Sequence, residues 1–232
     1  MTKKELILQV SGVSKSFKQG RDVVKILDGA NLSLYKNEVV ALVGPSGCGK
    51  TTFLQIIGLL DEPTKGSIII NKNNLSNASD GQKTEFRKRN IGFVYQSHNL
   101  LSDFTAFDNI MMPLILTSKD QKFTRDSSVF KMLSKLGLEN RRNHFPSQLS
   151  GGEQQRVAIG RSIIHNPMLV LADEPTGNLD SKSARNVIDL LINAIKKQNK
   201  SLIIVTHNSA IAKKADRVIT IDKGKIVEKE DL

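Results

Sequence analysis

The sequence contains a single cysteine, Cys48, and no tryptophan among its 232 residues. One cysteine excludes an internal disulfide and is typical of a protein in a reducing cytoplasm. No apolar run approaches the roughly 18 residues that a membrane-spanning helix requires. The apolar stretch after Glu5 is also too short for a secretory signal, so we expect none.

Aromatic residues make up only 5% of the chain, and no basic run is interleaved with them. Stacking on nucleic-acid bases therefore has little support, and no nucleic-acid partner is expected. The formal net charge is +11, which is compatible with a solvated surface, an anionic membrane face or a phosphate-bearing ligand. Charge alone does not choose among these.

The overall composition is that of an ordinary folded domain. Hydrophobic residues make up 39% and charged residues 25% of the chain, so disorder is not expected. A length of 232 residues suits one well-buried α/β domain and is short for two. No linker rich in proline, glycine or serine divides the sequence, and we therefore predict a single domain over residues 1–232.

Strand patterns occupy both ends of the chain and helical patterns the middle. The expected strands are residues 6–10, 23–34 (with a turn at Asp28 and Gly29), 39–43, 68–70, 91–94, 168–172, 201–206 and 217–221. The expected helices are residues 53–60, 106–116, 127–136, 152–164 and 189–197. The pattern predicts an α/β fold with a mostly parallel sheet in a core of residues 1–96 and 166–232, an N-terminal antiparallel β subdomain, and an inserted helical subdomain at about residues 97–165.

A glycine-rich loop joins the strand expected at residues 39–43 to the following helix. It matches the P-loop pattern and reads Gly44-Pro45-Ser46-Gly47-Cys48-Gly49-Lys50-Thr51-Thr52. Glycines let backbone N–H groups turn onto phosphate oxygens, and the helix N-terminus adds a favourable dipole. Lys50 is suited to the β- and γ-phosphates and the Thr51 hydroxyl to Mg²⁺. These residues predict a P-loop NTPase core that binds ATP and Mg²⁺, with Cys48 as a small filler rather than a nucleophile.

Two acidic residues, Asp173 and Glu174, end the apolar strand expected at residues 168–172. Two carboxylates at the end of a buried strand are costly unless cations or hydrogen bonds meet them. Mg²⁺ on a nucleotide at the neighbouring P-loop supplies that cation, so Asp173 is predicted to contact the metal. Glu174, on the opposite face of the strand end, is predicted to orient and deprotonate the attacking water.

His207 and Gln96 follow the strands expected at residues 201–206 and 91–94. A lone polar residue in such a position is usually structural or merely exposed. The strand ends of open α/β sheets nevertheless converge on the ligand site, which favours a functional role for both side chains.

A second phosphate-binding device opens the helix expected at residues 152–164. Ser150 suits the N-cap, and Gly151 and Gly152 expose their amides at a helix end that favours an anion. The run Leu149-Ser150-Gly151-Gly152-Glu153-Gln154-Gln155-Arg156 resembles the signature motif of ABC ATPases. Essentially the whole chain is similar to the nucleotide-binding domain of ABC transporters.

This resemblance implies specific roles. Asp173 and Glu174 look like the Walker B pair, with Lys50, Glu174 and His207 as catalytic residues. The remaining implied roles are adenine stacking by Phe17, metal contact by Thr51 and Gln96, a D-loop at Gly177-Asn178-Leu179-Asp180, and contact of Ser150, Gly151, Gly152 and Gln154 with the ATP of an opposing chain.

The resemblance also implies partners. Two chains would face each other head-to-tail as a homodimer and would pair with two transmembrane permease subunits, through which they contact the membrane at the cytoplasmic face of the inner membrane. Several apolar residues after Gln96 either form the helical subdomain's own core or receive a permease helix. They are Leu100, Leu101, Phe104, Phe107, Met111 and Met112.

Further motifs resemble one subgroup, the lipoprotein-releasing, macrolide-export and cell-division ATPases. Residues 58–64 and 176–180 fit all three branches, whereas residues 93–114 look most like the lipoprotein-releasing branch. This implies a motor that drives release of lipoproteins from the inner membrane for sorting to the outer membrane.

Cell-division and macrolide-export ATPases are the near alternatives. A soluble ABC ATPase acting on nucleic acid or ribosomes needs a coiled-coil insertion or tandem domains, and this sequence has neither. A non-hydrolysing regulatory subunit conflicts with the presence of Asp173, Glu174 and His207.

Overall fold

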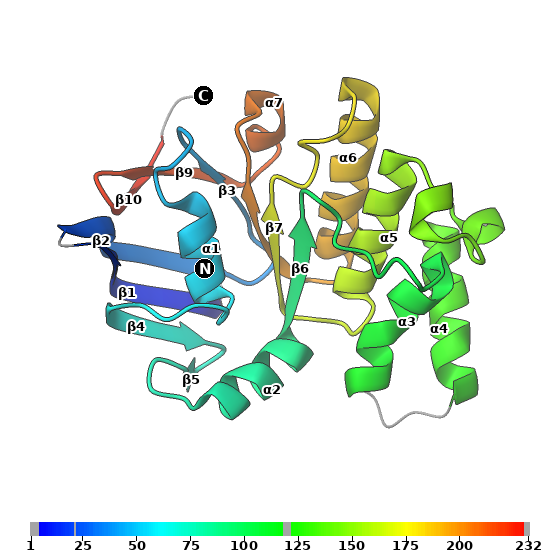
Figure 1. Cartoon of the computed structure of the whole chain (residues 1–232), viewed down its shortest axis with the longest axis horizontal. Helices are drawn as coiled ribbons and strands as arrows, with labels where there is room; N and C mark the ends of the chain where they lie inside the picture. Colours follow the sequence, from blue (N-terminus) through cyan, green and yellow to red (C-terminus); the bar gives the residue numbers. More distant parts are fainter. Residues whose placement is uncertain (1–4, 21, 118–121, 230–232) are drawn as a thin grey trace.

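The computed structural model describes residues 5–20, 22–117 and 122–229. Two β-sheets stand beside a group of helices (Figure 1). The smaller sheet is antiparallel and has the order β2-β1-β4-β5. Its strands are β1 (Leu6–Gln19), β2 (Asp22–Tyr35), β4 (Lys65–Ile70) and β5 (Asn73–Asn74).

The larger sheet has six strands in the order β10-β9-β3-β8-β7-β6. They are β3 (Val39–Val43), β6 (Ile91–Tyr95), β7 (Leu169–Asp173), β8 (Ser201–Val205), β9 (Arg217–Asp222) and β10 (Lys225–Glu228). Every pair is parallel except β9 with the edge strand β10. Continuous apolar runs such as residues 39–42 are buried here, as expected for parallel strands covered on both faces.

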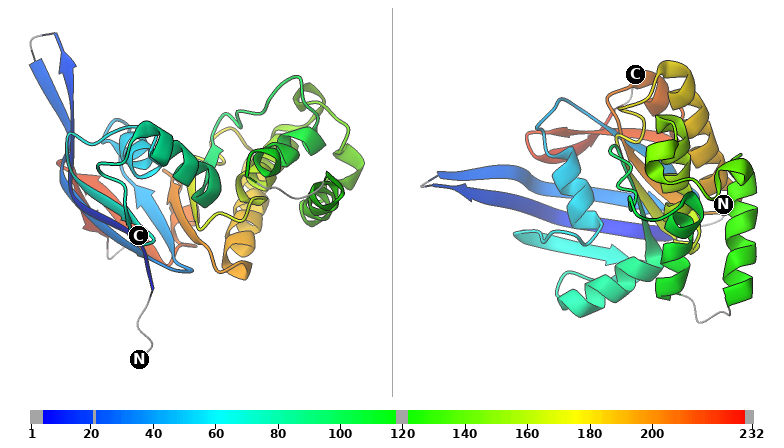
Figure 2. Two further views of the ribbon diagram at one scale, coloured as in Figure 1. Left: turned by 90° about the horizontal axis from the view of Figure 1, so that it is seen from below. Right: turned by 45° about the vertical axis from the view of Figure 1, so that its right-hand side comes forward.

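The helices divide into those that cover the sheets and those that form a separate group. The described helices are α1 (Lys50–Ile57), α2 (Asp80–Asn90), α3 (Ala106–Thr117), α4 (Lys122–Lys135), α5 (Gly151–Ile163), α6 (Ser181–Lys197) and α7 (Ser209–Ala212). Figure 2 shows α3, α4 and α5 together on one side, away from the paired ends of β1 and β2. The α/β fold class, with its antiparallel N-terminal sheet and inserted helices, is confirmed.

Two apolar clusters form the core. One surrounds α1, whose Phe53 and Ile57 are fully buried between the smaller sheet and the larger one. The other joins α3, α4, α5 and α6 to the opposite face of the larger sheet. Because α1 begins directly after the glycine-rich loop, its burial fixes that loop against the sheet.

The turn predicted at Asp28 and Gly29 is wrong, because β2 continues through both residues. Gly29 has a φ of 73°, and the register between β1 and β2 shifts repeatedly along their length. The Gly29 N–H donates to Ser14 Oγ at 2.9 Å, and the Asp28 N–H donates to the Gly224 oxygen at 2.8 Å. The Asp-Gly pair therefore marks bulges within a continuous strand, and not a turn between two strands.

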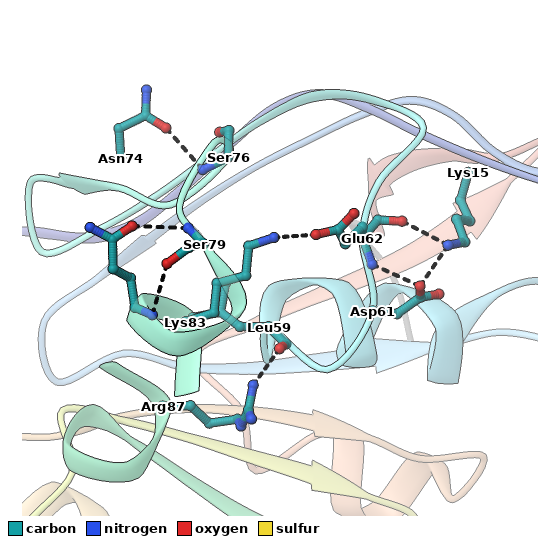
Figure 3. A network of polar contacts seen from close by, with 10 residues as sticks. Lys15, Leu59, Asp61, Glu62, Asn74, Ser76, Ser79, Lys83 and Arg87 are labelled. Atoms are coloured by element: carbon teal, nitrogen blue, oxygen red, sulfur yellow. Dashed lines mark hydrogen bonds and ion pairs between the residues drawn. The ribbon is translucent and has the colours of Figure 1, made fainter. Parts of the chain in front are cut away.

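Helix α2 was missed by the sequence analysis because it has almost no apolar face; Lys83 is its one buried residue. Polar contacts hold it instead (Figure 3). Lys83 pairs with Glu62, and Arg87 donates to the Leu59 oxygen. Lys15 of β1 reaches the same segment, 2.6 Å from Asp61 Oδ1, so α2, β1 and the loop after α1 are tied together.

Strand β6 and helix α5 touch through their backbones. A Cβ atom on Gly92 would lie 2.1 Å from the Ser162 backbone oxygen. Because this is a backbone atom, the strand or the helix would have to shift to make room for it. We predict that Gly92→Ala lowers the free energy of unfolding by about 2–3 kcal/mol through overpacking. Urea denaturation measures the change.

Gly81→Ala in α2 is the matched control, since its Cβ would meet nothing nearer than Ser79 Oγ at 4.0 Å. It should leave stability unchanged or raise it by up to about 1 kcal/mol through helix propensity. Equal effects of the two substitutions would contradict the backbone contact.

Candidate functional site

The register of four parallel strands sets the geometry of the site. Leu42, Val205, Asp173 and Tyr95 are register partners across β3, β8, β7 and β6, and so form one row near the carboxyl ends. Among the predicted residues, Asp173 lies in this row, and Gln96, Glu174 and His207 lie one or two positions beyond it. Their side chains therefore collect at one edge of the sheet, where open α/β sheets bind ligands.

The glycine-rich loop at this edge is shaped for glycine. Gly44, Gly47 and Gly49 have φ values of 144°, 80° and 103°, a region that side chains rarely adopt. A Cβ on Gly49 would lie 2.8 Å from Ile26 Cγ2, and one on Gly44 would lie 3.0 Å from Cys48 Sγ. Side chains at Gly44 and Gly49 would therefore strain the backbone and crowd Cys48 and Ile26.

Lys50 lies across the loop that precedes it. Its Nζ atom donates to the Gly44 oxygen at 2.9 Å and to the Pro45 oxygen at 2.8 Å. Helix α1 has no acidic residue in its first turn, and no side chain in the described part of the chain caps its N-terminus. The ammonium group and the helix end therefore create a positive site for an anion.

Phe17 borders the same loop. It lines a hollow of about 190 Å³ with Ile26 and with residues of the loop and α1, which are Gly47, Gly49, Lys50, Thr51 and Thr52. Its ring is exposed, and Lys15 Nζ lies 5.0 Å from the ring centroid. The structure thus places the predicted aromatic residue beside the predicted phosphate loop.

A larger hollow of about 610 Å³ lies between the smaller sheet and β9–β10. Its charged residues neutralise one another, because Arg217 is 2.9 Å from Glu38 and also pairs with Glu228. The smaller hollow suits a phosphate ligand better, because Lys50 and the glycine-rich loop line it.

Asp173 meets the loop from the end of β7. Burial raises the pKa of its carboxyl group, and the negative charge of Glu174 adds to this effect. A hydrogen bond from the Thr51 hydroxyl and the positive charge of Lys50 act in the opposite direction. Lys50, Thr51 and Asp173 therefore come together as the sequence predicted, around a carboxylate that still favours a further positive charge.

Glu174 has a left-handed backbone, with a φ of 45°. Such a conformation costs a non-glycine residue about 1 kcal/mol or more and is often found at functional sites. His207 Nδ1 lies 2.9 Å from Glu174 Oε2. The Glu174 side chain is 19% exposed and that of His207 is 73% exposed, so the pair stands at the open edge of the site.

Gln96 lies against the segment that follows Glu174. Its Nε2 atom donates to Asn178 Oδ1 at 3.1 Å, and Asn178 Nδ2 donates to the Gln96 backbone oxygen at 3.2 Å. The place of Gln96 at the site could be predicted from the sequence, whereas its partner Asn178 could not. Asp180, two residues further on, accepts from Lys182 N and Ser183 N and caps α6.

Ser150 caps α5, as predicted. Its side chain accepts from the Glu153 N–H, and the Ser150 N–H donates to Glu153 Oε2 at 2.8 Å. A Cβ on Gly151 would lie 3.3 Å from Leu179 Cδ2, so this glycine faces the segment before α6. Gln154 turns its Nε2 back onto the oxygens of Pro146 and Leu149.

The signature segment and the glycine-rich loop of one chain are on different sides of the sheet. In both figures β6 and β7 lie between α1 and α5. The two phosphate-binding devices of one chain therefore do not face a common hollow.

Two polar side chains that the sequence analysis missed shape the segment after Gln96. Arg161 of α5 donates to the oxygens of His98 and Asn99 at 2.9 and 2.7 Å, and burial lowers its pKa. The fully buried Asn109 bonds the backbone of Leu101 in both directions, with Leu101 N donating to its Oδ1 at 2.9 Å. A polar residue within the apolar run was the one signal for Asn109.

The apolar residues of this segment divide between core and surface. Met111 is buried and Leu100 and Phe107 pack against the core, whereas Leu101 and Phe104 are exposed by 41% and 40%. The first three residues therefore belong to the core, as one interpretation predicted, and Leu101 and Phe104 are the ones to which the other interpretation can still apply. Among the helices that the structure describes, none is long and apolar enough to cross a membrane.

Comparisons with known proteins agree with this geometry. The family model described as ABC transporter matches residues 27–177. The chain is 44% identical to the lipoprotein-releasing system ATP-binding protein LolD of Legionella pneumophila (strain Lens), over 97% of this chain and 99% of that protein. It is 45% identical to LolD of Rickettsia typhi (strain Wilmington), over 94% and 96% respectively.

Solved structures give the same result. A bacterial ABC transporter cassette solved as a dimer matches with a TM-score of 0.89 and 37% identity, over 96% of this chain and 98% of that one. A dimeric post-hydrolysis state of an ATP-binding cassette with ADP and Pi matches with a TM-score of 0.89 and 36% identity, over the same shares.

The cap of α5 generates a prediction about pH. A hydrogen bond from the Ser150 N–H, assisted by Arg141, lowers the pKa of Glu153 from 4.5 to about 2. This lowered pKa contributes stability above about pH 4.5 that is lost as pH falls towards about 2. Glu153→Gln keeps the capping box and loses the charge, so its free energy of unfolding should be about 2 kcal/mol lower at pH 7.

Urea denaturation of both proteins between pH 7 and pH 3 measures this. The difference in the free energy of unfolding between the two proteins should be constant down to about pH 5 and then shrink. A gap that does not depend on pH would assign the loss to the cap geometry instead of the charge.

Proposed function

The chain belongs to the ABC transporter family, and on this premise we propose that it is the ATP-hydrolysing motor that drives release of lipoproteins from the inner membrane for sorting to the outer membrane. The observation that carries the cargo assignment is the similarity to lipoprotein-releasing ATP-binding proteins over almost the whole chain. The subunit lies at the cytoplasmic face of the inner membrane, as a peripheral protein held by its permease.

ATP binds at the glycine-rich loop. Backbone N–H groups of the loop (residues 44–52, apart from Pro45) and the Lys50 ammonium hold the phosphates, and Phe17 stacks on the adenine. The left-handed glycines, the Lys50 contacts across the loop and the shared hollow with Phe17 support this arrangement.

Thr51, Asp173 and Gln96 are the residues that would hold Mg²⁺. In the described part of the chain no group of three or more His, Cys, Asp or Glu residues could hold a metal by itself, which suits a cation bound through one carboxylate and the phosphates. Burial raises the pKa of Asp173, so a cation at this point would stabilise its ionised form. The cation would neutralise charge on the β- and γ-phosphates.

Glu174 serves as the general base. Water attacks the γ-phosphorus, the bond to the ADP oxygen breaks, and the water proton passes to the Glu174 carboxylate. His207 holds that carboxylate from its other side, as the 2.9 Å contact supports, and His207 and Lys50 stabilise the charge that develops on the phosphate.

Two chains act together as a homodimer. Ser150, Gly151, Gly152 and Gln154 of one chain complete the ATP site of the other, and Asp180 shapes the D-loop between them. The separation of the signature segment from the loop by β6 and β7 supports a site shared between chains. Within each chain, residues 1–96 and 166–232 act as the core and residues from about 97 to 165 as the moving helical subdomain.

Two permease subunits dock beside Gln96. The exposed Leu101 and Phe104 form an apolar surface directly after this residue, and the Arg161 and Asn109 contacts hold its backbone in place. An amphipathic helix of the permease fits such a surface.

Reconstitution tests the function. The chain and the membrane proteins that co-purify with it, placed in liposomes with an acylated lipoprotein, should release the lipoprotein to a soluble acceptor only with ATP and Mg²⁺. Capture of a cell-division permease, with no release, would overturn the cargo assignment and leave the ATPase assignment intact.

Glu174→Gln should keep ATP binding and slow hydrolysis by at least about 100-fold, the usual loss on removal of a general base. Phosphate release and equilibrium binding of labelled ATP measure the two effects. Lys50→Ala should lose binding as well as turnover. Near-native turnover by the Gln variant would take the base role from Glu174.

Phe104→Ala should reduce the amount of permease captured by the tagged chain about tenfold or more, because an exposed aromatic anchor is lost from the docking surface. Val227→Ala, at a side chain of similar exposure (44%) on β10, should leave capture unchanged. Quantified co-purification at equal thermal stability measures the difference. Full capture by the Phe104 variant would remove this residue from the proposed interface.

A further inference from the structure

The Gln96 side chain is held in one place by a partner 82 positions away in the sequence. Asn178 accepts from the Gln96 side-chain nitrogen and donates to the Gln96 backbone oxygen. The second bond orients Asn178 itself, so the first bond fixes the orientation of the Gln96 amide.

Gly177 makes room for this arrangement. A Cβ atom there would lie 2.6 Å from Gln96 Nε2 and 2.9 Å from Gln96 Cδ. The φ of Gly177 is outside the left-handed range, so its backbone would accept alanine. A side chain at this position would therefore displace the Gln96 amide from its present place.

The backbone around Gln96 is also fixed. Tyr95 is the register partner of Asp173, which puts Gln96 next to the acidic pair. On the other side, Arg161 holds the oxygens of His98 and Asn99, whose φ values are 60° and 48°. The orientation of the Gln96 amide is then the remaining variable.

We propose that Asn178 is a positioning residue that, together with Gly177, turns the Gln96 amide so that its oxygen is offered to the magnesium ion. This inference rests on the proposed function, in which Gln96 contacts Mg²⁺. The two ends of an amide are nearly equal in size, but only the oxygen is a ligand for a hard cation. With Nε2 bound to Asn178 Oδ1, the oxygen Oε1 is the end that remains for the metal.

A purely structural role explains the pair less well. Both side chains are exposed, and hydrogen bonds between exposed neutral groups add little to stability. Partners that orient a metal ligand commonly change metal affinity by tenfold or more.

The test compares nucleotide affinity with and without magnesium in the whole chain. Calorimetric titration with AMP-PNP, a non-hydrolysable ATP analogue, gives one dissociation constant in Mg²⁺ and one in EDTA. Asn178→Ala should reduce the gain from Mg²⁺ roughly threefold to tenfold and leave the constant in EDTA unchanged. Gly177→Ala should act in the same direction, because it displaces the same amide. Asn77→Ala, at another exposed asparagine, is the control and should change neither constant.

A double-mutant cycle separates this inference from the proposed function. Gln96→Ala should reduce the gain from Mg²⁺, and adding Asn178→Ala should cause no further loss, because Asn178 acts only through Gln96. If Gln96→Ala has no effect, the metal role of Gln96 is wrong and the inference falls with it. If Gln96→Ala has an effect but Asn178→Ala has none, or if the two losses add, only the positioning role is overturned.

Discussion

A half-buried carboxylate, stabilised by positive charge, is the constraint around which this molecule is organised. Asp173 ends a strand whose neighbours are buried, and burial makes its ionised form costly. Thr51 and Lys50 reduce that cost, but they belong to a segment more than 120 residues earlier in the chain. The parallel register β3-β8-β7-β6 brings the two together, and the same register delivers Gln96, Glu174 and His207 to one edge. The remaining elements keep that edge in place.

The sequence predicted the parts of the site that depend on local chemistry. The residues that determine the glycine-rich loop and the Ser150 cap each lie within ten positions of one another, so both features could be located from the sequence. The contacts that could not be predicted from the sequence are those between distant segments. The Gln96–Asn178 pair joins residues 82 positions apart, and helix α2 depends on an ion pair with Glu62 and a hydrogen bond to the Leu59 oxygen instead of an apolar face. Asp28 and Gly29 are residue types common in turns, but in this structure they lie at an irregularity within β2.

Helix α5 connects two functional regions within one rigid element. Ser150 begins it at the signature end, and Arg161 near its other end holds the backbone after Gln96. Eleven helical residues span about 16 Å, so the two regions lie at opposite ends of one continuous helix. Gln155, also on α5 and fully buried, reaches the Tyr95 oxygen directly before Gln96. The helical group and the edge of the sheet are therefore connected at several points.

The contact of Gly92 with the Ser162 backbone has a mechanical consequence. Ordinary helix–sheet interfaces are lined by side chains whose rotamers adjust, so small displacements are absorbed between the layers. Here the main chains of β6 and α5 meet with nothing between them. The two elements cannot move closer at this point, so a helix pressed towards the sheet pushes directly on the strand that leads to Gln96. Substitutions on the outer surface of the helical group leave this contact unchanged, because no side chain takes part in it.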